Sequence, residues 1–342
     1  MCLISKKYLG LDIADSSIEV ALVGQSWGRT KLISVGRVEL EAGLVKNGRI
    51  IDKEKLAISI KELFQTAKPK AIKNGELCFG LPESQTFLHH FYTTSKDNKE
   101  KQKTIEKELA ENIPITGKDL AYSLRILNED KEKTEILVAA TRQEVINEWR
   151  NFFKSIKLNV VNFDIEILAT FRNLFDHLQK EPVMLLDIGA NTTHVGVFDE
   201  FGLHYEYVIN KAGNDFSKII AEVLEIDVVK AEIEKLKSGL KNRSKKVVEE
   251  LENELNKIAK AIKESIESYN SGTDKKLAKV VLVGGSSLLI GLPEFFSKSL
   301  NIPVEIGKAR LTKEKLPLYY VEAIGLALGK AEKHWSKTDP NF

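Results

Sequence analysis

Cysteine is almost absent from this chain, which has only Cys2 and Cys78 in 342 residues and no C-x-x-C pair. Two cysteines this far apart exclude a disulfide framework or a cysteine-based zinc site and indicate a reducing compartment. Long apolar runs are missing as well, since none approaches the roughly 18 residues of a membrane-spanning helix. The first residues, MCLISKKY, are too short and polar for a signal peptide. We therefore expect a cytoplasmic protein that does not insert directly into a membrane.

An excess of charge of either sign is also missing. The 51 Lys and Arg nearly balance the 49 Asp and Glu, which leaves a formal net charge of +2. Such a chain has no global field to gather nucleic acid, and we find no convincing local basic patch, so no nucleic-acid partner is expected. A chain with 43% apolar and 29% charged residues is an ordinary globular protein, and its length suits two domains.

The segment 183–198, VMLLDIGANTTHVGVF, is the part of the chain around which the rest is organised. An apolar run ends in Asp187, a turn of small and polar residues follows, and a second apolar run completes a predicted β-hairpin. Such a turn offers backbone N–H groups and Thr hydroxyls to a phosphate, and its Asp can hold Mg²⁺ through water. Taken alone, the pattern fits a plain solvated hairpin equally well.

The chain repeats this pattern near its start. Residues 8–23, YLGLDIADSSIEVALV, form an apolar strand that ends in Asp12, then a turn, then a strand in which Ile18, Val20 and Leu22 alternate. A duplicated phosphate hairpin in a chain of this length predicts two similar domains that bind one nucleotide.

Three further segments carry candidate site residues. Gly213 and Asn214 open a predicted helix, whose N-terminal N–H groups are suited to an anion. Gly284 and Gly285 follow an apolar strand, where they let the backbone approach a flat or anionic group. Glu166 lies in the first turn of another predicted helix, where it either complements the helix dipole or orients a water or a metal.

Hydrophobic periodicity predicts a mixed α/β chain. Strands are predicted at 8–12, 18–23, 30–40, 76–81, 86–93, 121–128, 134–141, 158–163, 183–187, 194–198, 202–210, 279–283 and 303–306, and helices at 52–68, 104–112, 142–157, 164–178, 216–224, 228–237, 244–269, 292–300 and 319–332. Residues 82–157 are interpreted as a small inserted α+β subdomain.

The order of these segments resembles the five nucleotide segments of the actin-like ATPase superfamily. Within it, the chain is similar to the PilM family of type IV pilus assembly proteins, which is related to the division protein FtsA. The resemblance is carried by LGLDIADSSIEVALV, FGLPESQTFLHHF, ILVAATRQEV, VVNFDIEILA, LLDIGANTTHVGVF and VVLVGGSSLLIGLPEFF, with a small-residue helix at Ala323 and Gly325. PilM is favoured over FtsA because the chain lacks a C-terminal amphipathic membrane anchor of the FtsA sort.

The resemblance implies an α/β, two-domain actin-like (ribonuclease H-like) ATPase fold with a small inserted α+β subdomain of the FtsA and PilM kind. Domain I would cover 1–163, with the subdomain at about 82–157, and domain II would cover 164–316. Residues 317–342 would form a C-terminal helix that packs back toward domain I, followed by a tail.

The resemblance also implies ATP and Mg²⁺ as cofactors, with Glu166 as the candidate catalytic acid and both hairpin aspartates holding Mg²⁺ through water. The implied nucleotide-binding residues are Asp12, Ser16 and Ser17 in the first phosphate loop, Asp187, Gly189, Asn191 and Thr192 in the second, Gly213 and Asn214 at the ribose and phosphates, Glu234 and Lys237 at the ribose or adenine, and Gly284, Gly285 and Ser286 at the adenosine. Glu232 and Lys235 are the rival pair to Glu234 and Lys237.

Two residues depart from the family pattern. Ala14 stands where a Gly is usual, and Glu19 stands where a Lys is usual. An acid near a triphosphate would weaken binding if its side chain points inward. Efficient turnover needs a positioned water and stabilisation of the leaving phosphate, so at most a weak ATPase is expected.

The implied function is an ATP-binding scaffold of the inner-membrane assembly platform of a type IV pilus or a related secretion system. The protein would dock the N-terminal cytoplasmic tail of a PilN-like membrane protein, through which it would be peripheral on the inner membrane. The tail would add as a strand to the inserted subdomain, near the strands between residues 77 and 91. The alternatives are a self-associating, FtsA-like filament protein and a small-molecule kinase of the same superfamily, for which no acceptor-site segment with a catalytic Asp is found.

Overall fold

The chain folds into two compact units, and each is described by itself. The computed structural model describes residues 6–271, 273–311, 316–335 and 342. The first unit consists of Met1–His177, Ala309–Leu316 and Tyr320–Phe342, and the second of Leu178–Lys308 and Pro317–Tyr319. The chain therefore leaves the first unit at His177 and returns to it near its C-terminal end.

The first unit is built on a five-stranded sheet with the order β10-β6-β1-β2-β3. The pairs β1–β2 and β2–β3 are antiparallel, whereas β6 runs parallel to both β1 and β10. The strands are β1 (Lys6–Ile13), β2 (Ser17–Ser26), β3 (Arg29–Glu39), β6 (Glu76–Leu81) and β10 (Val160–Ile165), and a separate small hairpin joins β4 (Val45–Lys46) to β5 (Arg49–Ile50). Because successive side chains of a strand point to opposite faces, β1 and β2 contribute to two cores.

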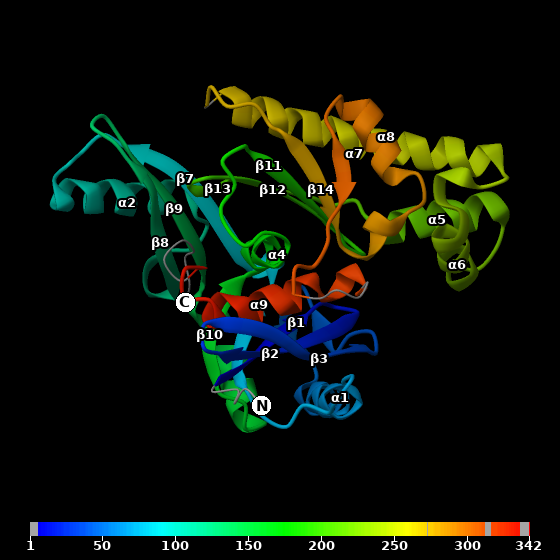
Figure 1. Cartoon of the computed structure of the whole chain (residues 1–342), viewed down its shortest axis with the longest axis horizontal. Helices are drawn as coiled ribbons and strands as arrows, with labels where there is room; N and C mark the ends of the chain where they lie inside the picture. The colour runs from blue at the N-terminus through cyan, green and yellow to red at the C-terminus, as the bar shows by residue number, and fades with distance from the viewer. Residues whose placement is uncertain (1–5, 272, 312–315, 336–341) are drawn as a thin grey trace. The chain divides into compact units, whose positions relative to one another are not determined.

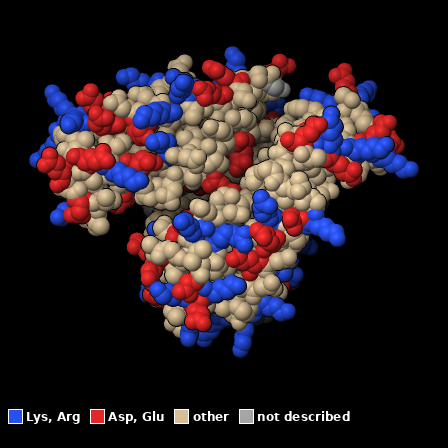
Figure 2. Space-filling view, turned by 180° about the vertical axis from the view of Figure 1, so that it is seen from behind, with Lys and Arg blue, Asp and Glu red and all other residues tan. Residues whose placement is uncertain are grey.

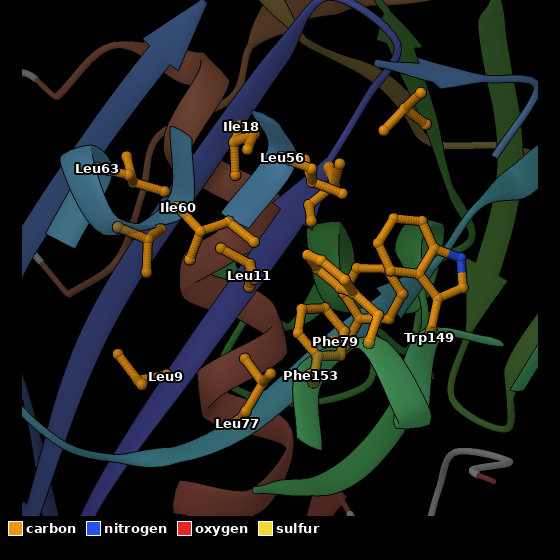
Figure 3. Close-up of a cluster of buried hydrophobic side chains, with 14 of the residues drawn as sticks. Leu9, Leu11, Ile18, Leu56, Ile60, Leu63, Leu77, Phe79, Trp149 and Phe153 are labelled. Atoms are coloured by element: carbon orange, nitrogen blue, oxygen red, sulfur yellow. The ribbon is translucent and has the colours of Figure 1, made fainter. Parts of the chain in front are cut away.

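Helices α1 (Lys53–Thr66) and α3 (Gln143–Ser155) cover one face of this sheet. Helix α1 begins after Asp52, whose carboxylate accepts a hydrogen bond from the backbone N–H of Lys55 at 3.0 Å. Trp149 of α3 packs on Phe79 of β6 with their ring centroids 4.6 Å apart. Figure 3 shows this core, in which the labelled side chains are Leu9, Leu11, Ile18, Leu56, Ile60, Leu63, Leu77, Phe79, Trp149 and Phe153.

Helices α4 (Glu166–Leu174) and α9 (Val321–Ala331) pack together, and α9 covers the other face of the sheet, over β1 and β2 (Figure 1). Glycine permits two close approaches here. A Cβ atom on Gly10 would lie 1.8 Å from the carbonyl oxygen of Ala323, and a Cβ on Gly325 would lie 1.7 Å from that of Ala169. Backbone thus meets backbone on both sides of α9, which ties the last helix to the first sheet.

The inserted subdomain is a three-stranded antiparallel sheet with the order β7-β9-β8. It consists of β7 (Thr86–Thr93), α2 (Asn98–Asn112), β8 (Leu120–Glu129) and β9 (Thr134–Arg142). Ile105 and Leu109 of α2 share a small core with Ile136 and Val138 of β9. Helix α3 lies within the 82–157 segment that the sequence assigned to this subdomain, but its buried face packs into the main core instead.

The second unit repeats the sheet of the first. Its strand order is β13-β12-β11-β14-β15, with β11, β12 and β13 antiparallel and β14 and β15 parallel to β11. The strands are β11 (Val183–Ile188), β12 (Thr193–Asp199), β13 (Gly202–Ile209), β14 (Lys279–Val283) and β15 (Val304–Ile306). The duplication predicted from the two acid-tipped hairpins therefore extends to two five-stranded sheets of the same topology.

Four helices pack in the second unit. They are α5 (Gly213–Leu224), α6 (Val228–Ser238), α7 (Lys245–Ser271) and α8 (Leu292–Leu300). Leu251, Leu255 and Ile258 of α7 are buried in the main core of this unit, together with Leu186 of β11 and Phe296 of α8. Helices α5 and α6 form one end of the unit, beside the start of α7 (Figure 1).

Helix α4 belongs to the first unit, although the sequence placed residues from 164 onward in domain II. A buried ion pair shows why. Arg172 Nη2 of α4 lies 2.5 Å from Asp164 Oδ2, and Asn173 Nδ2 donates to the carbonyl oxygen of Val321 in α9 at 2.9 Å. Asp164 is the penultimate residue of β10, and the helix that was predicted from residue 164 begins at Glu166. Most of the tail predicted after α9 lies outside the described residues.

The surface carries both signs of charge in close alternation. Figure 2 shows Lys and Arg interspersed with Asp and Glu over the face that it presents, in keeping with the balanced composition. Within the described residues, no helix combines the length and the apolar composition that crossing a bilayer requires.

Candidate functional site

The second acid-tipped hairpin has the predicted form. Asp187 is the penultimate residue of β11 and pairs in register with His194 of β12. The turn is closed by a hydrogen bond from the N–H of Gly189 to the carbonyl oxygen of Thr192 at 3.0 Å. Ala190 and Asn191 form its exposed tip. The strand alternation buries Leu186 and Ile188 and leaves Asp187 partly exposed at the end of the strand.

The first turn of α5 docks on this tip. The N–H of Gly213 donates to the carbonyl oxygen of Gly189 at 3.2 Å, and that of Asn214 donates to Ala190 at 2.8 Å. The side-chain amide of Asn214 also reaches Asn191 Oδ1 at 2.8 Å. Helix α5 begins at Gly213, in the turn that the sequence placed at its opening, and the hairpin carbonyls satisfy N–H groups that would otherwise lack partners.

The loop after β14 also packs against the second hairpin. Gly284 has φ +81°, and a Cβ atom there would lie 2.3 Å from Asp187 Oδ1, so only glycine fits. It leads into the short 3₁₀ helix η4 (Gly285–Leu288), whose Ser286 donates a hydrogen bond to the carbonyl oxygen of Gly189 at 2.9 Å. Gly213 packs against the same hydroxyl, since a Cβ on Gly213 would lie 2.1 Å from Ser286 Oγ.

A buried cation lies behind Gly213. Lys235 Nζ donates to the carbonyl oxygen of Gly213 at 3.0 Å and forms an ion pair with Glu232 Oε2 at 2.6 Å. Glu232 also accepts a hydrogen bond from Ser217 Oγ at 2.5 Å. One turn of α6 thus brings an acid and a cation to the start of α5, where hydrogen bonds to Ser217 and Gly213 hold them.

The pair Glu234 and Lys237 lies elsewhere on α6. Glu234 Oε1 accepts hydrogen bonds from Ser238 Oγ at 2.8 Å and from Asn242 Nδ2 at 2.9 Å, and Lys237 is exposed. The structure therefore places the rival pair, Glu232 and Lys235, against Gly213. Which pair meets Gly213 depends on which side of α6 faces α5. Residues 232 and 235 are on that side, where Ala231 is also buried.

The first hairpin has the same strand pairing and the same turn hydrogen bond as the second. Ala14 N–H donates to the carbonyl oxygen of Ser17 at 3.0 Å, and the carbonyl oxygen of Ser16 accepts a hydrogen bond from the N–H of Leu40 at 2.8 Å. Asp12 is the penultimate residue of β1, as Asp187 is of β11. The hydroxyl of Ser17 donates to Glu19 Oε2 at 3.3 Å, which directs it along β2 and not to the tip.

Glu19 is buried beside this hairpin. Its carboxylate forms an ion pair with Arg37 of β3 at 2.9 Å. Burial raises the pKa of Glu19 to about 7, against the opposing effects of the Arg37 charge and the hydrogen bond from Ser17. The residue that replaces the usual Lys of the family is therefore an acid with its own partners within the sheet.

Three carboxylates converge in the first unit. One oxygen from each of Asp12, Glu166 and Glu322 lies within 4.8 Å of the others. Gly80 of β6 makes room for them, since a Cβ there would lie 3.0 Å from Glu322 Oε1 and 3.3 Å from Glu166 Cγ. Carboxylate oxygens are the ligands that Mg²⁺ prefers, directly or through water. Sequence reasoning singled out Asp12 and Glu166 but missed Glu322, because an acid in the first turn of a helix has an ordinary explanation.

The residues that meet in the second unit fit a nucleotide. Gly189, Gly284 and Gly285 expose backbone without side chains, which lets a flat or anionic group approach. Gly213 is buried, and the N–H groups of Gly213 and Asn214, which the sequence offered to an anion, are bonded to hairpin carbonyls instead. A Cβ on Gly285 would meet nothing within 4 Å, so the loop is open there. The buried Lys235, whose charge is balanced by Glu232, supports Gly213 from behind, and Asp187 supplies an acid for a cation.

Comparison with known proteins identifies the family. Residues 10–328 match the family described as type IV pilus assembly protein PilM. The cell division protein FtsA of Streptococcus pneumoniae is 23% identical over 343 residues, which cover 87% of this chain and 75% of FtsA.

Among solved structures, the PilM–PilN type IV pilus biogenesis complex has a TM-score of 0.80 at 21% identity, covering 95% of this chain and 98% of that chain. MreB5 of Spiroplasma citri bound to ADP has a TM-score of 0.60 at 13% identity and covers 98% of each chain. Both likenesses confirm the actin-like ATPase fold that the sequence predicted. Because the family match spans nearly the whole sequence, the chain belongs to the PilM family of type IV pilus assembly proteins.

Proposed function

We propose that this protein is an ATP-binding scaffold on the cytoplasmic side of the type IV pilus assembly platform, where it docks the N-terminal tail of a PilN-like inner-membrane protein. Membership of the PilM family supports the assembly role. The observation that carries the docking is an exposed apolar row on the edge strand β8.

The apolar row consists of Tyr122, Leu124 and Ile126, each between 38% and 43% exposed. These residues pair in register with Ala140, Val138 and Ile136 of β9. Directly opposed residues of antiparallel strands point to the same face, and on β9 that face packs on α2. The apolar row therefore continues the covered face of the small sheet to its open edge.

An extended peptide fits this edge by strand addition. The outer backbone groups of β8 would pair with the peptide, and the apolar row would contact every second side chain of it. The sequence analysis placed the groove near residues 77–91. Residues 76–81 form β6, which is interior to the main sheet, whereas 86–93 form β7, the other open edge of the small sheet. The exposed apolar row favours β8 of these two edges.

A synthetic N-terminal tail of the PilN protein from the same organism tests the docking. With a fluorescent label, it should bind the full chain, and Ile126→Asp should weaken its affinity by at least about tenfold, because a charge would replace apolar contact at the edge. Ile306→Asp is the matched control, since Ile306 is 36% exposed on the edge strand β15 of the second unit. Equal affinity of the Ile126→Asp variant and the native chain would remove β8 as the docking edge.

For the nucleotide, we propose Mg-ATP bound at the second hairpin and α5. Support comes from the glycine-lined junction and the buried Lys235, and the related MreB5 structure contains ADP. Within the second unit, the proposed contacts are Gly189, Asn191 and Thr192 for phosphates, Gly213 and Asn214 for ribose and phosphates, Glu232 and Lys235 for ribose or adenine, and Gly284, Gly285 and Ser286 for adenosine. Asp187 would hold Mg²⁺ through water.

Calorimetric titration with Mg-ATP tests this part separately from the docking. Asp187→Ala should abolish binding, because the variant loses the acid that lies beside Gly284. Unchanged affinity in this variant would remove the proposed nucleotide site and leave the docking proposal untouched.

A further inference from the structure

A stripe of aliphatic side chains projects from α6 on the side opposite its buried face. Val229, Ile233 and Leu236 are 72%, 61% and 52% exposed. Their spacing of four and three residues aligns them along one side of the helix. The opposite side carries the buried Ala231 and Lys235. Nothing in the described part of the chain covers this aliphatic stripe.

Positive charge surrounds the aliphatic stripe. Between residues 228 and 246 the chain has seven Lys or Arg and two Glu. Lys230 and Lys237 flank the stripe by helical spacing, and the exposed residues Lys241, Arg243, Lys245 and Lys246 follow in the turn and the start of α7.

Acidic residues near the aliphatic stripe already form ion pairs. Asp227 pairs with Lys230 at 2.9 Å, and Glu232 is engaged by the buried Lys235. Lys237 and the four basic residues after it form no ion pair among the described residues, so their charge is available to a partner. This patch is not evident from the sequence, because its Lys and Arg are interrupted by Leu, Ser and Gly, and only the fold exposes them beside an apolar side of a helix.

We propose that α6 and the basic turn after it dock on an anionic lipid surface. Aliphatic side chains that project beside Lys and Arg suit the boundary between lipid headgroups and acyl chains, where the apolar groups enter and the cations meet anionic headgroups. The contact is adsorption at one surface, and it goes beyond the proposed function because it needs neither the nucleotide nor the docked tail.

Other occupants fit less well. A second copy placed symmetrically on the same patch would bring the lysines of both copies together, which is unfavourable. A protein partner needs a complementary hollow for three protruding aliphatic groups, whereas a fluid acyl layer adapts to them.

Co-sedimentation with vesicles tests the proposal on the full chain. Phosphatidylcholine vesicles that contain phosphatidylglycerol should bind the protein, and pure phosphatidylcholine vesicles should not. The double variant Val229→Gln/Ile233→Gln should lose at least about tenfold in partition, because two apolar groups no longer enter the interface. Lys237→Glu/Lys241→Glu should lose a comparable factor, and added salt should weaken binding by the native chain.

The matched control is Ile58→Gln, because Ile58 is 65% exposed on α1 of the first unit, close to the exposure of Ile233. It should bind as the native chain does, and circular dichroism should show all variants folded. Absence of binding to the anionic vesicles overturns the proposal, as does an equal loss in Ile58→Gln. If the α6 variants change the sedimentation of the lipid-free protein and leave vesicle binding intact, the stripe is a contact between copies and the proposal is wrong.

Discussion

Glu19 lies directly opposite Asp12 on the paired strands β2 and β1. Opposed side chains share a face of the sheet, and the neighbouring Gly10 shows that this face is the one that α9 covers. The first hairpin therefore carries two carboxylates side by side, with Arg37 next to Glu19 on β3. Where the family usually has a cation, this chain has a buried acid whose pKa is raised to about 7.

The raised pKa of Glu19 predicts a pH-dependent stability. The unfolded carboxyl ionises near its ordinary pKa of 4.5, whereas in the folded protein burial, which exceeds the opposing effect of Arg37, raises the pKa to about 7. Below pH 4.5 the Glu19 carboxyl is protonated in both the folded and the unfolded state, and its contribution to the free energy of unfolding is then at its largest. As pH rises toward 7 the unfolded state has already ionised, so the free energy of unfolding falls by up to about 3 kcal/mol.

Urea unfolding at several pH values measures this effect. The free energy of unfolding of the native chain, relative to that of Glu19→Gln, should decrease as pH rises from about 5 to about 8. Glu39→Gln, an exposed acid on β3, should show no such trend relative to the native chain. A constant difference between the native chain and Glu19→Gln would contradict the burial argument.

Lys235 and Lys237 separate the two rival pairs on α6. Lys235→Ala should weaken Mg-ATP binding by about 10-fold to 100-fold, because it removes a charge-assisted donor beside Gly213. Lys237→Ala is the matched control and should bind as the native chain does, since its side chain is exposed. Isothermal titration calorimetry gives both affinities. A loss in Lys237→Ala alone would favour the pair Glu234 and Lys237 instead.

Gly213 and Ser286 should behave as a coupled pair. Gly213→Ala introduces a Cβ that would lie 2.1 Å from Ser286 Oγ, so the turn must shift and Mg-ATP affinity should fall by at least about tenfold. Ser286→Ala removes that oxygen, and the double variant should recover part of the loss. The coupling is read from a double-mutant cycle in the same titration. If the losses of affinity in the two single variants simply add in the double variant, the overlap between the new Cβ and Ser286 Oγ is not the cause of the loss.

Gly325 should be intolerant of a side chain. A Cβ at this position would lie 1.7 Å from the carbonyl oxygen of Ala169, and backbone on both helices cannot give way cheaply. Gly325→Ala should therefore destabilise the protein by about 3 kcal/mol or more in urea unfolding. Gly285→Ala is the control for stability, because its Cβ would meet nothing within 4 Å. Equal stability of the two variants would contradict the close packing of α4 on α9.

The carboxylates Asp12, Glu166 and Glu322 predict a divalent-cation site. Mn²⁺ is a convenient probe, since its unbound fraction is measured by electron paramagnetic resonance. Glu322→Gln should weaken Mn²⁺ binding by about tenfold, because one charged oxygen ligand becomes neutral. Glu54→Gln, on the exposed side of α1, should leave it unchanged. If Glu322→Gln binds Mn²⁺ as the native chain does, the three acids do not hold a cation together.

Local pattern was sufficient for much of the fold. Strand, acid and turn are consecutive at 8–17 and again at 183–193, so alternation and turn chemistry predicted both hairpins, and the shared sheet topology confirms the duplication. The start of α2 was predicted at 104 but lies at Asn98, where Asp97 accepts hydrogen bonds from the N–H groups of Lys99 and Glu100. The charged segment between has no apolar periodicity, so the pattern could not reveal this first turn.

By itself, the sequence determined the family, the duplicated α/β architecture and the position of each acid at the end of its strand, because these depend on neighbouring residues. Only the tertiary structure decided which turn of α6 meets Gly213, which unit holds α4, and that Glu322 joins Asp12 and Glu166. Each of these depends on helix phase and packing between elements distant in the chain, and single-sequence periodicity carries no information about such contacts.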